Sequence, residues 1–382
     1  MKIVVFGLTV SSSWGNGHAT LWRGLARALI RRGHRFVFFE KDVPYYAGTR
    51  DLWEIPGGEL VLYPGWEDVL PYARSHLADA DVAMVTSYCA DAVAATRLVL
   101  DSPARLRTFY DMDTPVTLDG LRAGADIAYL PPQGLAGFDL VLSYTGGPAL
   151  AELRTRLGAR RTAPLYGHVD PDVHRPVPPL PGEHADVSYL GTYAADRQAA
   201  LEALFIEPAR RMPDRRFLVA GAQYPHDFPW TGNVYFRRHL PPPEHPAFFC
   251  SSGLTVNVTR RAMAEMGWCP SGRLFEAAAC GVPILSDRWD GLDAFFTPGE
   301  EILTAVSTDE AIDAISLPRS ELARIGAAAR ERVLAEHTSD ARAAELEALL
   351  DATVRGEGWP SPEDADTGGV MAKETLAMEA RA

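Results

Sequence analysis

Residues 270–287 have the sequence PSGRLFEAAACGVPILSD, which predicts a helix that leads directly into a buried strand. Ser271 can cap this helix, and Gly272 lets a ligand approach the free amides of its first turn. The Gly-Val-Pro segment at 281–283 ends the helix and begins the strand. A helix joined this closely to an apolar strand is typical of an α/β sheet.

Glu276 lies among alanines on this predicted helix. A carboxylate packed against a sheet costs stability unless it is paired or hydrogen-bonded. A ligand hydroxyl is therefore a natural partner for Glu276, and a salt bridge with an internal arginine is the structural alternative.

The same alternation of short apolar runs and helical patterns extends along the chain and predicts two parallel, helix-covered sheets. The predicted strands are 2–8, 35–40, 59–63, 81–86, 106–111 and 139–144 in the first half, and 186–190, 216–220, 233–236, 254–258, 282–286 and 301–305 in the second.

A proline-rich stretch at 171–182 can neither continue a helix nor fill a central strand, so we interpret it as an interdomain linker. The predicted domains are then 1–170 and 183–355, the second ending in a helical stretch at 319–350. Residues 356–382 have little to bury and are expected to form a mobile tail. In open α/β sheets ligands bind at the carboxyl ends of the strands, so the residues just after each strand become the functional candidates.

Composition narrows the function classes. The chain has 382 residues, 47% of them hydrophobic, and a net charge of −13, which disfavours broad nucleic-acid binding. The four cysteines form no C-x-x-C pair, and the first residues fit a buried strand better than a signal peptide. With no apolar run long enough to cross a membrane, we expect a cytoplasmic protein with reduced thiols and no membrane span.

The loop after the first strand, residues 11–20, is SSSWGNGHAT. Gly15 and Gly17 match the first two glycines of the dinucleotide fingerprint, but Thr20 stands where the third would be, so the loop is either a plain tight turn or a binding loop. His18 lies on the first turn of the following helix. It either contacts substrate or makes a local hydrogen bond.

Asp111 and Asp113 form an Asp-x-Asp pair at the end of the strand at 106–111. Two such carboxylates could bind a metal, orient a hydroxyl or accept its proton, whereas a structural role for Asp113 is to cap the turn that begins at Pro115. We favour acceptor-side chemistry for Asp113 over metal binding.

Polar residues also follow two strands of the second half. Gly191 permits close backbone approach, Thr192 offers a hydroxyl and an amide, and Arg197 supplies a charged fork suited to phosphate. An ordinary turn with a solvated arginine is the alternative. Asn257 and Arg260 follow another strand, and Arg260 is the better anion ligand of the Arg260–Arg261 pair because it lies nearer the strand end.

The segment at 270–287, continued by WDGL at 289–292 and FFTPGEEIL at 295–303, resembles the C-terminal domain of GT-B glycosyltransferases, most closely the spore-maturation CgeB-like branch. The chain also looks similar at 15–18, 110–117 and 240–242. The resemblance implies two Rossmann-like α/β domains facing each other across a cleft. It further implies a nucleotide-diphosphate-sugar donor on the C-terminal domain, an acceptor on the N-terminal domain and no essential metal.

Carried onto this chain, the resemblance implies that Glu276 bonds the ribose hydroxyls and that His239 and Leu240 flank the base. It also implies that Arg197 and Arg260, with nearby backbone amides, hold the diphosphate. It places His18 near the transferred sugar, and together with the acceptor-side role favoured above for Asp113 this makes His18 and Asp113 the expected catalytic residues. The expected donor-binding residues are Gly15, Gly17, Gly191, Thr192, Arg197, His239, Leu240, Asn257, Arg260, Ser271, Gly272, Arg273 and Glu276.

One position departs from the family. Related retaining enzymes carry two glutamates separated by seven residues, and with Glu276 as the second, Trp268 occupies the place of the first. The stereochemical outcome therefore stays open.

We accordingly expect a glycosyltransferase that uses a nucleotide sugar, a UDP-sugar as the first guess, with no other cofactor. Its acceptor would be a small molecule, a glycan or a protein. The alternatives are a non-catalytic nucleotide-sugar-binding protein of the spore-coat type and a sugar-nucleotide epimerase. A nicotinamide-dependent oxidoreductase ranks last because the opening glycine loop departs from the fingerprint.

Overall fold

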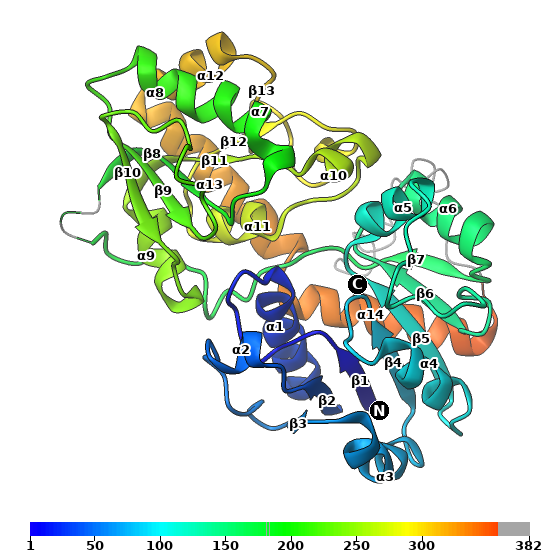
Figure 1. The fold of residues 1–382 in the computed structure, drawn as a ribbon. Coiled ribbons are helices and arrows are strands. Elements are labelled where there is room, and N and C mark those ends of the chain that lie inside the picture. Colours follow the sequence, from blue (N-terminus) through cyan, green and yellow to red (C-terminus); the bar gives the residue numbers. More distant parts are fainter. Residues whose placement is uncertain (181, 183, 358–382) are drawn as a thin grey trace, which may run out of the picture.

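A computed structural model describes residues 1–180, 182 and 184–357, which form two parallel α/β sheets, each covered by helices (Figure 1). The N-terminal sheet has seven strands in the order β3-β2-β1-β4-β5-β6-β7. They are β1 (Lys2–Gly7), β2 (Arg35–Lys41), β3 (Glu59–Tyr63), β4 (Val82–Thr86), β5 (Leu106–Asp111), β6 (Leu140–Ser143) and β7 (Thr162–Pro164).

The central strands of this sheet are buried on both faces because helices cover both. Side chains of α1 belong to one hydrophobic cluster, and those of α3, α4 and α6 belong to the cluster on the other face. The helices are α1 (Gly17–Arg31), α2 (Pro44–Ala47), α3 (Trp66–Leu77), α4 (Ala92–Leu100), α5 (Thr114–Arg122) and α6 (Pro148–Leu157).

The C-terminal sheet has six strands in the order β10-β9-β8-β11-β12-β13. They are β8 (Ala185–Leu190), β9 (Phe217–Gly221), β10 (Val234–Arg238), β11 (Ser252–Asn257), β12 (Ile284–Asp287) and β13 (Leu303–Ala305). The helical segments are η1 (Ala195–Arg197), α7 (Gln198–Leu201), η2 (Glu202–Ile206), α8 (Glu207–Arg211), η3 (Pro242–Glu244), α9 (His245–Cys250), α10 (Arg261–Met266), α11 (Gly272–Ala279), η4 (Leu292–Ala294), α12 (Thr308–Ile315) and α13 (Arg319–Glu336).

Both sheets share one winding. In each, the first strand has the second on one side and the fourth on the other, so the strand order reverses between β1 and β4 and again between β8 and β11. Ligands of doubly wound sheets bind at the carboxyl ends of such strand pairs. The predicted fold class is confirmed, and every predicted strand overlaps an observed one. The short edge strand β7 was not predicted.

The last described helix, α14 (Ser339–Arg355), corrects the predicted domain assignment. The sequence placed it in the C-terminal domain, but it packs against α1 of the N-terminal domain (Figure 1). Its buried side chains Leu346, Leu349 and Leu350 belong to the first hydrophobic cluster, and Glu347 pairs with Arg32. A leucine stripe on a helix indicates that one face is buried, but not which sheet it covers.

The chain therefore passes between the domains twice, and the two passages lie side by side. Val169 forms a bridge with Thr338, the Ser339 amide donates to the Val169 carbonyl at 2.7 Å, and the Val169 amide donates to the His337 carbonyl at 3.0 Å. The predicted helical stretch at 319–350 consists of two helices, α13 and α14, which are separated at this crossing, where the Thr338 side chain caps α14.

The other sequence expectations have the following outcomes. All four cysteines are free. Among the described residues, no helix combines the length and the apolar character that a membrane crossing requires. Of the predicted tail at 356–382, residues 358–382 lie outside the described residues.

Candidate functional site

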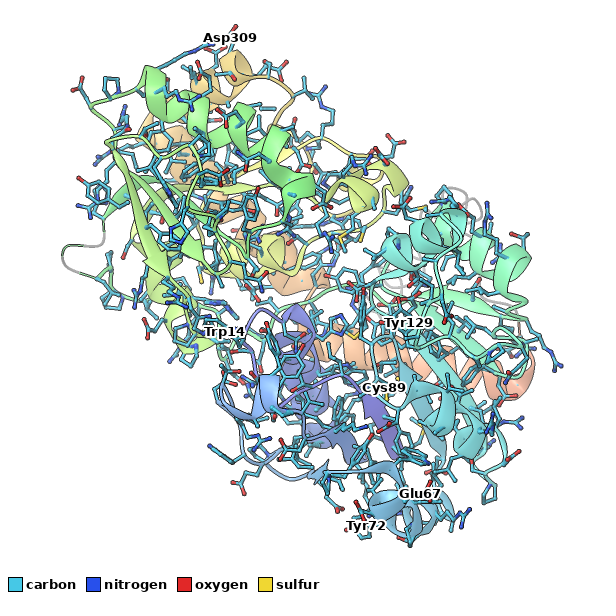
Figure 2. All side chains as sticks on the ribbon, in the orientation of Figure 1. Trp14, Glu67, Tyr72, Cys89, Tyr129 and Asp309 are labelled. Carbon is cyan, nitrogen blue, oxygen red and sulfur yellow. The ribbon has the colours of Figure 1, made fainter. Side chains whose placement is uncertain are left out.

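The carboxyl ends of the two sheets face each other and touch. The Trp14 ring, in the loop between β1 and α1, lies 4.4 Å from the ring of His239, which directly follows β10. Figure 2 shows Trp14 on the side of the N-terminal domain that faces the other domain. Gly15 has a φ of +60°, and a Cβ there would lie 3.7 Å from the Tyr45 hydroxyl and 4.0 Å from the Gln223 side chain. The predicted glycine loop thus lies at the domain interface.

The structure brings the two expected catalytic residues together. His18 Nε2 lies 2.7 Å from Asp113 Oδ2, although the residues are 95 positions apart. Asn16 caps α1 by accepting the His18 amide at 3.0 Å, which fixes the start of the helix that carries His18. His18 Nδ1 is enclosed without a partner, whereas Asp113 Oδ1 takes no hydrogen bond from the described residues and its side chain is 18% exposed. Asp113 is therefore the open member of the pair, and His18 orients it.

Asp111 lies beneath Asp113 and is fully buried. Its Oδ1 accepts the Asp113 amide at 3.0 Å, and its Oδ2 has no partner among the described residues. Burial raises the pKa of Asp111 to about 7. The Asp-x-Asp pair is therefore split, with one carboxyl supporting the loop and the other facing outward, and the described residues do not group it with a third metal ligand.

Tyr88, which sequence reasoning missed, lies beside this pair. It has a φ of +59°, a conformation that non-glycine residues rarely adopt. Its ring lies 6.2 Å from that of His18 and 4.7 Å from that of Tyr129, and the residue is 40% exposed. The sequence offered only its position after β4 as a signal.

Two arginines of the C-terminal domain, Arg197 and Arg273, reach the loop at 191–192 from different elements. Arg273 donates from Nη1 to Asn257 Oδ1 at 2.9 Å, and Arg197 donates from Nη1 to the Thr192 carbonyl at 3.1 Å. The Nε atoms of both are enclosed without partners, and within the described residues neither makes an ion pair. Burial, followed by the neighbouring charge of Arg197, lowers the pKa of Arg273. Adjacent guanidinium groups with unused donors form a site for an anion.

Glycines open this site to a ligand. A Cβ on Gly191 would lie 2.8 Å from Arg273 Nη2, so any other residue at this position would force the guanidinium group to move. At Gly272, the first residue of α11, nothing lies within 4 Å of an added Cβ. Ser271 occupies the N-cap position, but contrary to expectation its side chain makes no capping bond. The Leu274 amide donates to the Ser271 carbonyl at 3.0 Å, and among the described residues the amides of Gly272 and Arg273 have no acceptor, so these two can bind a ligand.

The Glu276 side chain, on α11, lies in a cluster with two histidines. His245 Nδ1 lies 3.6 Å and His174 Nε2 4.0 Å from Glu276 Oε2. Burial alone would raise the pKa of Glu276, but His174, His245 and Arg273 together outweigh it and lower the pKa to about 2. Glu276 is therefore ionised, and within the described part of the chain it makes no direct salt bridge with an arginine.

Two of the residues expected to bind the donor, Asn257 and Leu240, have buried side chains. Asn257 is fully buried, holding Arg273 through Oδ1 and donating to Ser286 at 3.0 Å, so it positions an arginine and cannot reach a ligand. Leu240 is 3% exposed and belongs to the core, which leaves only its backbone near the site. A leucine and an asparagine at strand ends carry no sequence signal of which way their side chains turn.

The remaining positions lie around the same edge. Arg260 donates from Nε to Asp196 Oδ2 at 3.2 Å and is otherwise partly exposed, and an added Cβ on Gly17 would meet nothing within 4 Å. Trp268, at the position of the family's first glutamate, packs so closely on Gly147 and Gly291 that a Cβ on either would come within 2.5 Å of its ring.

Sequence reasoning missed both histidines beside Glu276. His174 lies in the proline-rich segment that the sequence identified only as a linker, and His245 begins a short helix.

A hollow of about 540 Å³, lined by residues such as Arg215 and Tyr235, lies at the opposite, amino-terminal ends of β9 and β10 and is separate from this site.

Comparisons with known proteins now add to this geometry. Residues 197–348 match a family model described as glycosyl transferase-like. A comparison with curated proteins finds no match. Sucrose-phosphate synthase from Thermosynechococcus elongatus superposes with a TM-score of 0.70 at 16% identity, covering 94% of this chain and 100% of that one. The chain has the GT-B fold.

Two further structures of this fold hold nucleotides. Anabaena HepE in complex with UDP and glucose has a TM-score of 0.63 at 13% identity, with 92% of this chain and 100% of that chain covered. An alpha-glucosyltransferase in complex with UDP-glucose and DNA containing an abasic site has a TM-score of 0.66 at 12% identity, covering 92% and 99%. The predicted GT-B architecture is confirmed, and membership of the CgeB-like branch stays a prediction.

Proposed function

We propose that this protein is a glycosyltransferase that moves a sugar from a nucleoside-diphosphate sugar, a UDP-sugar in the first instance, to a hydroxyl group of an acceptor. The observation that carries the proposal is the pair of neighbouring guanidinium groups of Arg197 and Arg273, which lack carboxylate partners among the described residues and lie beside Gly191. A confined positive site of this kind fits a diphosphate.

This site acts on the leaving group. As the bond between the sugar and the phosphate breaks, negative charge grows on the diphosphate, and prepositioned arginines with free amides at the start of α11 stabilise it. Because the protein itself supplies these charges, the proposed reaction needs no metal at the diphosphate.

Glu276 supplies the contact to the nucleoside. It is ionised, and its Oε2 is the oxygen that lies nearest to both histidines. Its carboxylate can therefore accept bonds from the two ribose hydroxyls, and hydrogen bonds to a charged group are the stronger class. His239, beside Trp14 at the domain interface, is the group nearest to the proposed base position.

The acceptor side lies on the opposite domain. Asp113 Oδ1 is free to take the proton of an acceptor hydroxyl, and His18 Nε2 holds the other oxygen in place. Tyr88 provides an exposed ring next to this carboxylate. The oxygen that loses its proton becomes the nucleophile, and the carboxyl end of the other sheet presents the donor to it.

The comparisons support the proposal at the level of the class. The C-terminal part of the chain matches a glycosyl transferase-like family model, and two structures of the same fold hold UDP or UDP-glucose. The sequence resemblance to the CgeB-like branch points the same way and leaves the acceptor open among small molecules, glycans and proteins.

Calorimetry tests the donor site first. We expect one nucleoside diphosphate from a panel of UDP, GDP, ADP and dTDP to bind with micromolar affinity, and Arg273→Ala to weaken that binding because charge-assisted bonds are lost. Arg261→Ala is the matched control, since this side chain is 69% exposed and lies on the same domain. If no nucleotide of the panel binds, the proposal fails.

Mass spectrometry of the donor then tests catalysis. Transfer to an acceptor, or slow hydrolysis without one, supports a transferase. A donor that is bound but never turned over would favour a non-catalytic binding protein, and a nucleotide sugar returned with altered stereochemistry would favour an epimerase.

A further inference from the structure

Three side chains from separate segments converge on one point. His174 comes from the first interdomain passage, His245 from the start of α9 and Glu276 from α11. One ligand atom of each lies within 4.8 Å of the other two, and this is the only such group of three or more histidine, cysteine or acidic side chains within residues 1–180, 182 and 184–357. None of these contacts is short enough to be a hydrogen bond between the members.

Both histidines leave a nitrogen unused at this point. His174 is 1% exposed, and its Nε2 is enclosed without a partner. His245 donates from Nε2 to the Leu240 carbonyl at 3.1 Å, which in the neutral ring leaves Nδ1 as a lone pair, and this atom also has no partner. An unprotonated Nδ1 held 3.6 Å from a carboxylate oxygen is unfavourable, and either a proton on that nitrogen or a cation bound between the two atoms relieves the contact.

We propose that His174, His245 and Glu276 form a binding site for a divalent transition-metal ion of the zinc class. Two imidazole nitrogens and one carboxylate oxygen are the ligand set of open tetrahedral zinc sites, whereas magnesium and calcium select oxygen ligands. Metal bonds of about 2.0–2.1 Å in tetrahedral geometry place the ligand atoms roughly 3.3 Å apart. The observed separations of 3.6 and 4.0 Å to Glu276 need only a small contraction.

The ion would occupy the same carboxylate that the proposed function assigns to the ribose. A metal on Glu276 neutralises the charge that the ribose hydroxyls need, so metal and nucleotide compete, and each lowers the affinity of the other by the same factor. This second step rests on the proposed function, whereas the metal site itself does not. Arg273, whose charge acts on Glu276, opposes the ion, so we expect micromolar affinity and not the tighter binding of a structural zinc.

Direct titration of the full chain with zinc chloride tests the site. We expect one ion per chain, and His174→Gln and His245→Gln should each lower the affinity more than about tenfold, since even outer-shell partners of a metal cost that much. His226→Gln is the matched control because His226 is exposed and outside the cluster, and it should leave the affinity unchanged. Cobalt(II) provides a second readout through the visible absorption of a tetrahedral site.

Failure of zinc to bind, or binding that both variants leave unchanged, would overturn the site. Melting temperatures recorded without metal show that each variant is folded. A variant that melts like the parent chain but has lost zinc confirms that the histidine is a ligand.

Titration of UDP with and without zinc tests the competition. We expect zinc to weaken UDP binding in the parent chain and to have no effect in His174→Gln, which separates competition from zinc binding to the nucleotide in solution. Zinc binding that leaves the UDP affinity unchanged would overturn the competition. If no nucleoside diphosphate binds, the proposed function fails, and the zinc titration still decides the site on its own.

Discussion

Replacing Glu276 with glutamine is the sharpest test of the donor site, because it keeps the shape of the side chain and removes its charge. With a pKa of about 2, the native carboxylate is ionised at any working pH. A hydrogen bond to a charged group contributes about 1.5–3 kcal/mol and a neutral one about 0.5–1.5 kcal/mol. The substitution therefore costs about 1–1.5 kcal/mol for each ribose hydroxyl that Glu276 binds.

This cost sets an expected pattern across nucleotides. If both hydroxyls bind Glu276, Glu276→Gln should raise the Kd for UDP by about 30- to 140-fold, and that for the 2′-deoxy nucleotide by about 5- to 12-fold. The 2′,3′-dideoxy nucleotide has neither hydroxyl and should bind both proteins equally. Isothermal titration calorimetry measures all three.

The comparison between nucleotides guards against a folding artefact. A variant that binds less well because it is partly unfolded would lose affinity for every nucleotide by the same factor. An equal loss for UDP and the dideoxy nucleotide would thus refute the ribose role of Glu276. Glu265→Gln, at a side chain that is 67% exposed, is the control and should change none of the values.

The remaining predictions concern the N-terminal domain. Asp113→Asn should lower kcat by about 10²- to 10⁴-fold with the donor Kd unchanged, and the same loss in the exposed Asp119→Asn control would argue against a proton-accepting role. Asp111→Asn should stabilise the protein at pH 8 by up to roughly 4 kcal/mol and give no gain near pH 4. The reason is that the pKa of Asp111 is about 7 in the folded protein and lower in the unfolded chain, so the native protein loses stability as the pH rises between these two pKa values. Thermal unfolding at the two pH values checks this, and an equal shift at both would contradict it. Leu346→Ala should cost about 2–5 kcal/mol in urea unfolding because α14 packs on α1, and a cost below 1 kcal/mol would contradict that packing.

The sequence predicted most of the fold because the signal is local. A run such as 82–86 is buried on both faces of a parallel sheet, and its continuous apolar character is visible without any knowledge of its neighbours. The missed strand β7 has only three residues, too few to show a pattern. The helix α14 was recognised as a helix but assigned to the wrong domain, since periodicity does not say which surface a helix will cover.

For the candidate site, the sequence predicted where residues lie relative to the strands better than it predicted which side chains they contact. Arg197 follows β8 in the short segment η1, whereas Glu276 lies on α11, so only the first of these two predicted donor ligands comes directly after a strand. Their partners could not be predicted, because no local pattern indicates that His174, in a proline-rich linker, lies beside Glu276. It also did not show that Asn257 would turn inward to hold Arg273.

The amino-acid sequence by itself determined which segments become strands and helices, and hence two parallel sheets joined near residue 170, because backbone propensity and apolar periodicity act over a few residues. Only the tertiary structure decided that His18 meets Asp113, that two histidines surround Glu276 and that the last described helix crosses back to the first domain. These contacts join residues far apart in the chain, and they depend on the close packing of whole elements, which no local pattern encodes.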